Sequence, residues 1–248
     1  MKRKQLIDLS VVYFGKGVGG LQIIILDILN SAINQGLTTQ LILNRREGIF
    51  SNRIPKRVNV VSSNSRWNIL FLPFLLFCKL LVNELVKSPK KTLVFADHSA
   101  SLALLVRKLL FWKTGPIYVE EAIYLSKYLL FQPFGKIRYW LVSWLYPSAT
   151  RIFVLSAEHK KDLVNNFGNP AGKIIILRNW VSPEFKVTQK AEKRDIDVLF
   201  VGRLELQKNL FLFIDVIAKL AEIFPSLCVH VVGPGSQSQA LKEYAIKN

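Results

Sequence analysis

The stretch "YFGKGVGGLQ" (residues 13–22) places four glycines within six positions, after an apolar strand-like run and before a helix-like one. Glycines at a strand-to-helix turn let the backbone approach an anion, and the N–H groups that begin the helix point toward it. Gly15, Gly17 and Gly20 also match the G-x-G-x-x-G pattern of dinucleotide-binding loops. The stretch therefore predicts a phosphate-binding loop in an α/β fold.

The end of the second strand-like run tests the dinucleotide interpretation. A dinucleotide-binding fold is expected to carry an acidic residue there, about 20 residues after the glycines, to hold the ribose hydroxyls. After "TTQLILN" the chain carries Arg45 and Arg46 instead. Two arginines suit the 2′-phosphate of NADP, or they form an ordinary solvated basic loop. An NADP-dependent oxidoreductase therefore stays open as an alternative.

Outward from this loop, strand-like and helix-like runs alternate, which predicts a doubly wound parallel sheet with helices on both faces. We expect strands at 5–14, 38–43, 58–61, 92–96, 116–120, 151–155 and 174–177, and helices at 20–35, 68–87, 99–112, 135–146 and 157–167. Gly36 is expected to end the first of these helices, and Ser156 to cap the last one.

The polar stretch "KVTQKAEKR" interrupts the alternation, which then restarts with the strand-like runs "IDVLFVGRL" and "CVHVVGPG", each followed by a helix. We therefore expect a complete Rossmann-like domain at 1–182, a linker at 183–194 and part of a second Rossmann-like domain at 195–248. Two strand–helix units leave a sheet edge and a sheet face uncovered, so the sequence looks C-terminally truncated.

The charge is concentrated in the first part of the chain. Residues 1–190 hold 27 Lys and Arg against 10 Asp and Glu, whereas residues 191–248 hold seven of each. In "RWNILFLPFLLFCKLL" and "YLLFQPFGKIRYWLVSWLY" the basic residues alternate with aromatic and aliphatic ones, a mixture typical of a membrane interface. The heavy aliphatic content argues against nucleic acid. The ten apolar residues at 69–78 are too few to span a bilayer and predict either a core helix or an interfacial one.

Taken in order, these motifs resemble the retaining, nucleotide-sugar-dependent glycosyltransferases of family 4, which have the two-domain GT-B fold. "GVGGLQ" is similar to their first glycine-rich loop, and "RIFVLSAEHKKDLVNNFGNPAGKIIILRNW" to the end of their first domain. "VLFVGRLELQKNLFLF" and "VHVVGPG" are similar to the opening of their nucleotide-binding domain. The resemblance implies sugar transfer to a glycan or lipid-linked acceptor with retention, in cell-envelope or surface glycan synthesis.

The resemblance also implies roles for particular residues. Arg203 and Lys208 would neutralise the charge that develops on the donor diphosphate, so no metal and no cofactor are expected. Gly19, Gly20 and Gly233 would let the backbone approach the donor. At Ala122 the family commonly has a histidine, so Glu121, or Glu120, is the candidate to bind the acceptor hydroxyl, with His98 as a second candidate.

The expected partners are a nucleotide-sugar, the acceptor and an anionic membrane surface, with the protein in the cytoplasm and peripheral on the inner face of the membrane. Two departures leave a further alternative. Ala122 replaces the histidine, and no part of the chain matches the family's paired glutamates, which fits a non-catalytic remnant that binds a membrane or an acceptor.

Overall fold

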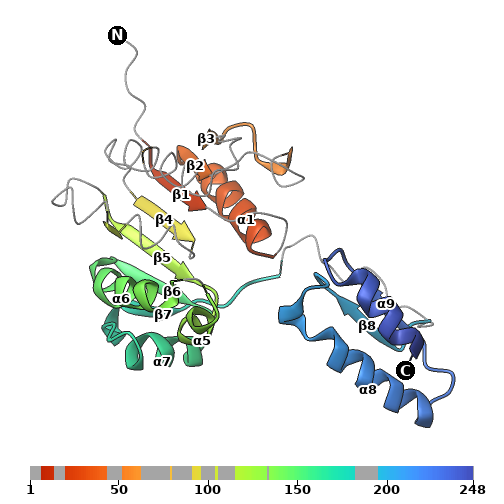
Figure 1. The fold of residues 1–248 in the computed structure, drawn as a ribbon. Coiled ribbons are helices and arrows are strands. Elements are labelled where there is room, and N and C mark those ends of the chain that lie inside the picture. Colours follow the sequence, from red (N-terminus) through yellow and green to blue (C-terminus); the bar gives the residue numbers. More distant parts are fainter. Residues whose placement is uncertain are drawn as a thin grey trace. The chain divides into compact units, whose positions relative to one another are not determined.

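The computed structural model describes residues 7–13, 20–43, 52–62, 79, 91–95, 104–105, 115–132, 134–181 and 195–247. The chain divides into two compact units, Met1–Ser182 and Pro183–Asn248, drawn from red to teal and in blue in Figure 1. The expected linker at 183–194 and most of the helices expected at 68–87 and 99–112 lie outside the described residues.

The first unit is built on a seven-stranded sheet with the order β3-β2-β1-β4-β5-β6-β7. Every neighbouring pair is parallel, so the predicted doubly wound parallel sheet is confirmed. The strands are β1 (Leu9–Tyr13), β2 (Thr39–Leu43), β3 (Asn59–Ser62), β4 (Lys91–Phe95), β5 (Ile117–Glu121), β6 (Arg151–Val154) and β7 (Ile174–Ile176).

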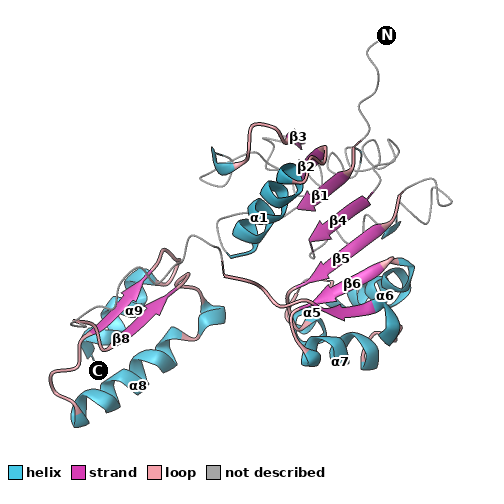
Figure 2. Cartoon of the chain, turned by 180° about the vertical axis from the view of Figure 1, so that it is seen from behind, coloured by secondary structure: helices cyan, strands magenta, loops and turns pink. Residues whose placement is uncertain are grey.

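Helices cover both faces of this sheet (Figure 2). They are α1 (Gly20–Asn34), α5 (Leu125–Leu130), α6 (Gly135–Leu145) and α7 (Ala157–Asn165), with 3-10 turns η1 (Tyr146–Ser148) and η2 (Ala171–Lys173). Buried residues of α1 pack with Val11 and Leu41 on one face, whereas those of α5, α6 and α7 pack with Val12 and Val119 on the other. Successive residues of a strand point to opposite faces, so β1 supplies side chains to both cores.

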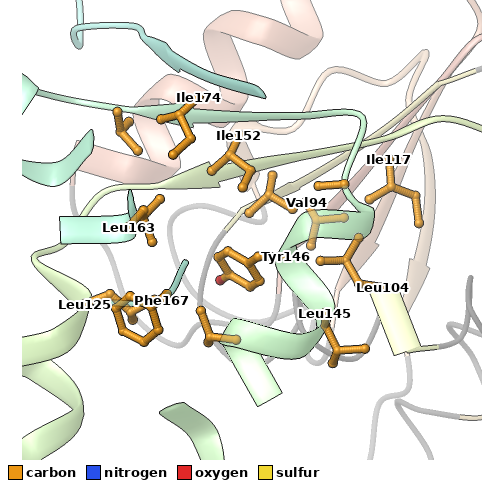
Figure 3. Close-up of a cluster of buried hydrophobic side chains, with 14 of the residues drawn as sticks. Val94, Leu104, Ile117, Leu125, Leu145, Tyr146, Ile152, Leu163, Phe167 and Ile174 are labelled. Atoms are coloured by element: carbon orange, nitrogen blue, oxygen red, sulfur yellow. The ribbon is translucent and has the colours of Figure 1, made fainter. Parts of the chain in front are cut away.

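The larger core of the first unit surrounds Tyr146, whose side chain is 1% exposed. Figure 3 shows Tyr146 among Val94, Ile152 and Leu145, with Phe167 and Leu163 toward α7. The Tyr146 hydroxyl lies in this apolar cluster and donates a hydrogen bond to Oε2 of Glu121 at 3.0 Å. A buried phenol therefore links the η1 turn to the carboxyl end of β5.

Two helix ends follow the predicted chemistry. Ser156 begins α7, and its hydroxyl accepts a hydrogen bond from the His159 N–H at 3.3 Å. Gly36 ends α1 with φ +76°, a left-handed conformation that glycine adopts without a steric penalty. Both expected caps are confirmed.

The second unit contains a two-stranded parallel sheet of β8 (Val198–Val201) and β9 (Val229–Val232). It also contains η3 (Leu206–Lys208), α8 (Leu210–Ile223) and α9 (Ser238–Lys247). Its core is small: Leu204, Leu210 and Leu241 are buried, and aromatic side chains of β8 and α8 pack against them. Both predicted strand–helix repeats are confirmed.

No helix in the described part of the chain has the length and apolar character needed to cross a bilayer. The apolar run at 69–78, for which we expect a core or an interfacial helix, lies outside the described residues.

Candidate functional site

The strand order of the first unit fixes where a ligand would bind. The chain moves outward from β1 through β2 to β3 and then returns to place β4 on the other side of β1. The register sets Val12 opposite Val94, and Phe95 opposite Glu120, so β1, β4 and β5 end at one edge. In doubly wound sheets ligands bind outside the carboxyl ends of the strands, where the strand order reverses.

Gly20 begins α1 directly after this edge. Within the part of the chain that the structure describes, a Cβ at Gly20 would meet no other atom within 4 Å. Among the described residues, packing therefore gives no reason for glycine at the start of this helix. The first turn of α1 carries no acidic residue that would repel an anion.

The start of α1 is also tied to the end of β1. The Gln22 side-chain amide donates a hydrogen bond to the Tyr13 hydroxyl at 2.5 Å, and both side chains are buried. This contact holds the first turn of the helix over the strand end. The remaining glycines of the predicted loop, Gly19 among them, and His98 after β4 lie outside the described residues.

The two glutamates at the end of β5 have different surroundings. Glu121 is 1% exposed, faces the larger core and accepts the hydrogen bond from Tyr146. Glu120 points to the opposite face, the one that α1 covers, because the direction of side chains alternates along a strand. The neighbouring Ala122 is half-buried and directly follows the strand. The sequence placed the candidate role first on Glu121, but the structure shows this carboxylate bonded inside the core.

Glu120 has the properties of a titrating functional group. It is 8% exposed, and among the described residues no hydrogen-bond partner reaches its Oε2. Burial disfavours the charged form and raises the pKa of Glu120 from 4.5 to about 7. Buried carboxyls with raised pKa values near a ligand-binding edge are candidates for proton transfer or for hydrogen bonding to a substrate hydroxyl.

In the second unit, Arg203 and Lys208 lie in the connection between β8 and α8. Both side chains are exposed, and Lys208 ends the η3 turn just before Asn209, which has φ +49°. This connection again follows the carboxyl end of a parallel strand. Two exposed cations therefore lie where an α/β unit places its ligand contacts.

Glu205, between the two cations, fastens this connection to the turn after β9. Its carboxylate accepts hydrogen bonds from the Ser236 N–H at 3.1 Å and the Ser236 hydroxyl at 2.8 Å. The hydroxyl, then the backbone N–H, lowers the pKa of Glu205, and the positive charge of Arg203 adds to the effect. The Leu204 N–H donates to the Pro234 carbonyl at 2.8 Å. The connection that carries both cations is thus held in place.

Gly233 lets the turn after β9 pack closely against the connection between β8 and α8. A Cβ at Gly233 would overlap the carbonyl of Gly202, and φ at Gly233 is +148°. A Cβ at Gly235 would likewise overlap the carbonyl of Leu204. Glycine is therefore required here for the close approach of two backbone segments, whether or not Gly233 also contacts a donor.

The segment after β7 is anchored in the first unit by Trp180. Its indole N–H donates to Oδ2 of Asp27 on α1 at 2.9 Å.

Within the described ranges, no group of three or more His, Cys, Asp or Glu side chains is arranged to hold a metal ion.

Two protein-family models match the chain, one after the other. The model described as Glycosyltransferase Family 4 matches residues 18–185, and the model described as Glycosyl transferases group 1 matches residues 181–248. The models meet close to the division between the two compact units. A search of curated proteins finds no match.

Solved structures of similar fold include the lipopolysaccharide outer core galactosyltransferase WaaB, at 18% identity and TM-score 0.62, and HepE of Anabaena in complex with UDP and glucose, at 16% and 0.66. The match covers 96% of this chain and 64% of WaaB, and 97% of this chain and 65% of HepE. The chain therefore spans just under two thirds of these proteins.

The UDP-GlcNAc 2-epimerase of Methanocaldococcus jannaschii also matches, at 15% identity and TM-score 0.57, over 96% of this chain and 69% of that protein. Because an epimerase shares the architecture, these likenesses establish the GT-B type of fold and no activity. The Glycosyltransferase Family 4 model, in contrast, matches more than half of the chain. The matched residues include Gly20 and Glu120 of the first unit. The chain belongs to glycosyltransferase family 4.

Proposed function

We propose that the protein transfers a sugar from a nucleotide-sugar donor to a glycan or lipid-linked acceptor, with retention of configuration, in the synthesis of a cell-envelope or surface glycan. The observation that carries the proposal is the pair of exposed cations, Arg203 and Lys208, held at a strand end in the unit matched by the second glycosyltransferase model. Because the chain spans less than two thirds of WaaB and HepE, this activity is proposed for the protein of which the chain is a part or the whole.

In this proposal Arg203 and Lys208 bind the donor diphosphate. When the bond between the sugar and the phosphate breaks, its electron pair leaves with the diphosphate, and the two cations stabilise that charge without a metal ion. In the first unit, Gly20 begins α1, where backbone N–H groups favour an anion. Gly233 keeps the β9 turn close to the connection that carries the cations.

In this proposal the acceptor hydroxyl binds at the carboxyl end of β5. Glu120 has an unpartnered, buried oxygen among the described residues and a pKa near neutrality, so it accepts a hydrogen bond from the hydroxyl that attacks the anomeric carbon. Glu121 supports that strand end through Tyr146. His98, after β4, stays a second candidate for contact with the acceptor.

The location we propose is the cytoplasm, peripheral on the inner face of the membrane. The support is the positive excess of residues 1–190, which matches the negative surface potential of a cytoplasmic leaflet. The interleaved aromatic residues favour lipid over nucleic acid as the anionic partner.

Calorimetric titration with nucleotide-sugars and with NADPH tests the proposal on the chain as it is. We expect a nucleotide-sugar to bind, and Arg203→Ala to weaken that binding by about 1.5–3 kcal/mol, the range for a hydrogen bond to a charged group. Lys219→Ala is the matched control because it removes an equally exposed positive charge from α8, away from the connection. Tight NADPH binding with no nucleotide-sugar binding would instead favour the oxidoreductase, and binding of neither would favour a non-catalytic protein.

A further inference from the structure

Helix α6 is apolar on two sides. Val142 and Leu145 face inward and belong to the larger core. Ile137, Trp140 and Trp144, spaced by three and four residues, form an outer stripe with exposed fractions of 58%, 60% and 44%. A surface helix of a water-soluble domain normally turns charged and polar residues outward. The outer stripe of α6 therefore needs an apolar environment that the described part of the chain does not supply.

The turn between α5 and α6 extends this stripe. Leu130, Phe131 and Phe134 are 79%, 86% and 75% exposed, which places three large apolar side chains at the tip of the helix pair. We call the six residues Leu130, Phe131, Phe134, Ile137, Trp140 and Trp144 the α5–α6 apolar surface. Figure 2 shows α5, α6 and α7 gathered on one side of the sheet, so the turn is presented by packed helices.

The described residues on either side of this turn have a constrained backbone. Phe134 has φ +57°, a left-handed conformation that is rare for a bulky residue and costs on the order of 1–3 kcal/mol. A Cβ at Gly135 would overlap the Leu129 carbonyl, so the chain turns tightly at this point. The Gly135 N–H donates to the Gln132 carbonyl at 3.1 Å, and the Arg138 N–H to the Phe134 carbonyl at 3.0 Å. The protein thus holds Phe134 outward at an energetic cost.

Helix α6 is also attached to the end of α7 and the residues that follow it. The Tyr139 hydroxyl donates a hydrogen bond to the Asn166 carbonyl, and the Tyr139 ring packs against Phe167 with ring centres 4.4 Å apart. On the outer side, Trp140 and Trp144 stack with ring centres 5.4 Å apart. The stacked indoles form a rigid amphipathic plate, the kind of side chain that collects at the boundary between lipid and water.

The segment that forms this surface carries charges of one sign. Residues 122–157 contain no Asp or Glu and four basic residues. Lys127 and Lys136 are exposed beside the tip, and the Arg138 guanidinium lies over the Tyr128 ring at 5.8 Å. An apolar centre flanked by these basic residues complements a bilayer with anionic headgroups. Two copies of this surface facing each other would instead bring like charges together.

We propose that the α5–α6 apolar surface is the membrane-docking face of the protein, with its aromatic tip inserted among the headgroups of an anionic bilayer and Lys127 and Lys136 on lipid phosphates. Amphipathic elements of this kind enter a bilayer to a depth of about 5–10 Å. The inference adds the contacting surface to the proposed membrane location. It does not depend on sugar transfer.

Vesicle flotation with the full chain tests this assignment. We compare vesicles of phosphatidylcholine alone with vesicles that also contain phosphatidylglycerol, and we expect binding mainly to the second. The variant Phe131→Ser with Phe134→Asn should lower the partition coefficient at least tenfold. Asparagine tolerates the left-handed conformation better than phenylalanine, so this variant should melt no lower than the wild type and loss of binding cannot reflect unfolding. The control Ile246→Ser removes an apolar side chain of matching exposure, 85%, from α9.

Three outcomes would overturn the proposal. The variant could bind anionic vesicles as the wild type does, or the wild type could bind neutral and anionic vesicles equally. Sedimentation could instead show a dimer that the variant dissociates, which would make the surface a self-association face. Nucleotide-sugar titration of the same variant should be unchanged. A chain that binds vesicles through this surface and binds no nucleotide-sugar would contradict the proposed function while leaving the docking face intact.

Discussion

The two units start their first strands in the same way and bury them very differently. In the first unit, the Asp8 and Leu9 N–H groups donate to the Thr38 carbonyl at 2.9 and 3.2 Å, and the Asp8 carboxylate accepts from the Thr38 N–H. In the second, Asp197 and Val198 make the same contacts with Cys228 at 2.9 and 3.2 Å. Each unit therefore uses one aspartate, Asp8 or Asp197, to align its first strand with the parallel strand beside it.

Burial separates the units beyond this shared contact. All five residues of β2 are buried, whereas Leu199 and Val201 of β8 are 55% and 70% exposed. The same holds for the helices, since α1 buries six residues and α8 only Leu210. An apolar strand–helix pattern therefore specifies local structure, while the number of neighbouring strands and helices determines how much apolar surface is buried.

The largest expected difference between the units is in backbone opening. Amide hydrogen exchange on the intact chain should show β1 and β2 exchanging roughly 100-fold or more slowly than β8 and β9, because strands with few buried contacts open at low free energy. Mass spectrometry of peptic peptides gives both rates in one experiment. Equal protection of the two sheets would show that the second unit gains stability from contacts outside the described residues.

Glu120 in the first unit should give the next largest effect. Its pKa is raised by burial, so the folded state holds a proton that the unfolded state releases above pH 4.5, and stability falls as pH rises from about 4.5 to 7. Glu120→Gln removes this loss. We expect the variant to match the wild type near pH 4 and to exceed it by up to about 3 kcal/mol above pH 7. Urea unfolding across this pH range measures the difference, and a constant difference would contradict the raised pKa.

Glu205 in the second unit should show the opposite sign and a smaller effect. Hydrogen bonds from Ser236 lower its pKa, so its contribution is present above the ordinary value of 4.5 and is lost as pH falls through the folded value. Ser236→Ala should therefore raise the pKa of Glu205, which NMR titration of the carboxyl carbon can follow. A pKa that stays low in this variant would assign the effect to the Ser236 backbone N–H and to Arg203 instead.

The sequence predicted the strands of the first unit closely. All seven strands of the first sheet are where hydrophobic runs placed them, apart from a first strand that begins at Leu9 and not at residue 5. Helix α5 was missed because six residues are too few to show a helical period. The choice between Glu120 and Glu121 was beyond the sequence, since neighbouring residues of a strand face opposite sides and composition does not say which side holds Tyr146.

From the sequence alone follow the alternation of strands and helices, the glycine-rich stretch before α1, the position of Arg203 and Lys208 after a strand, and the excess of positive charge. These features depend on local backbone preferences and on residue order. The tertiary structure was needed to show that β4 pairs with β1 and so creates the reversal of strand order. It also showed that Oε2 of Glu120 has no hydrogen-bond partner among the described residues, and that α6 turns Trp140 and Trp144 outward. Those properties arise from which distant segments pack together, because burial and solvation belong to the assembled fold and not to any single stretch of chain.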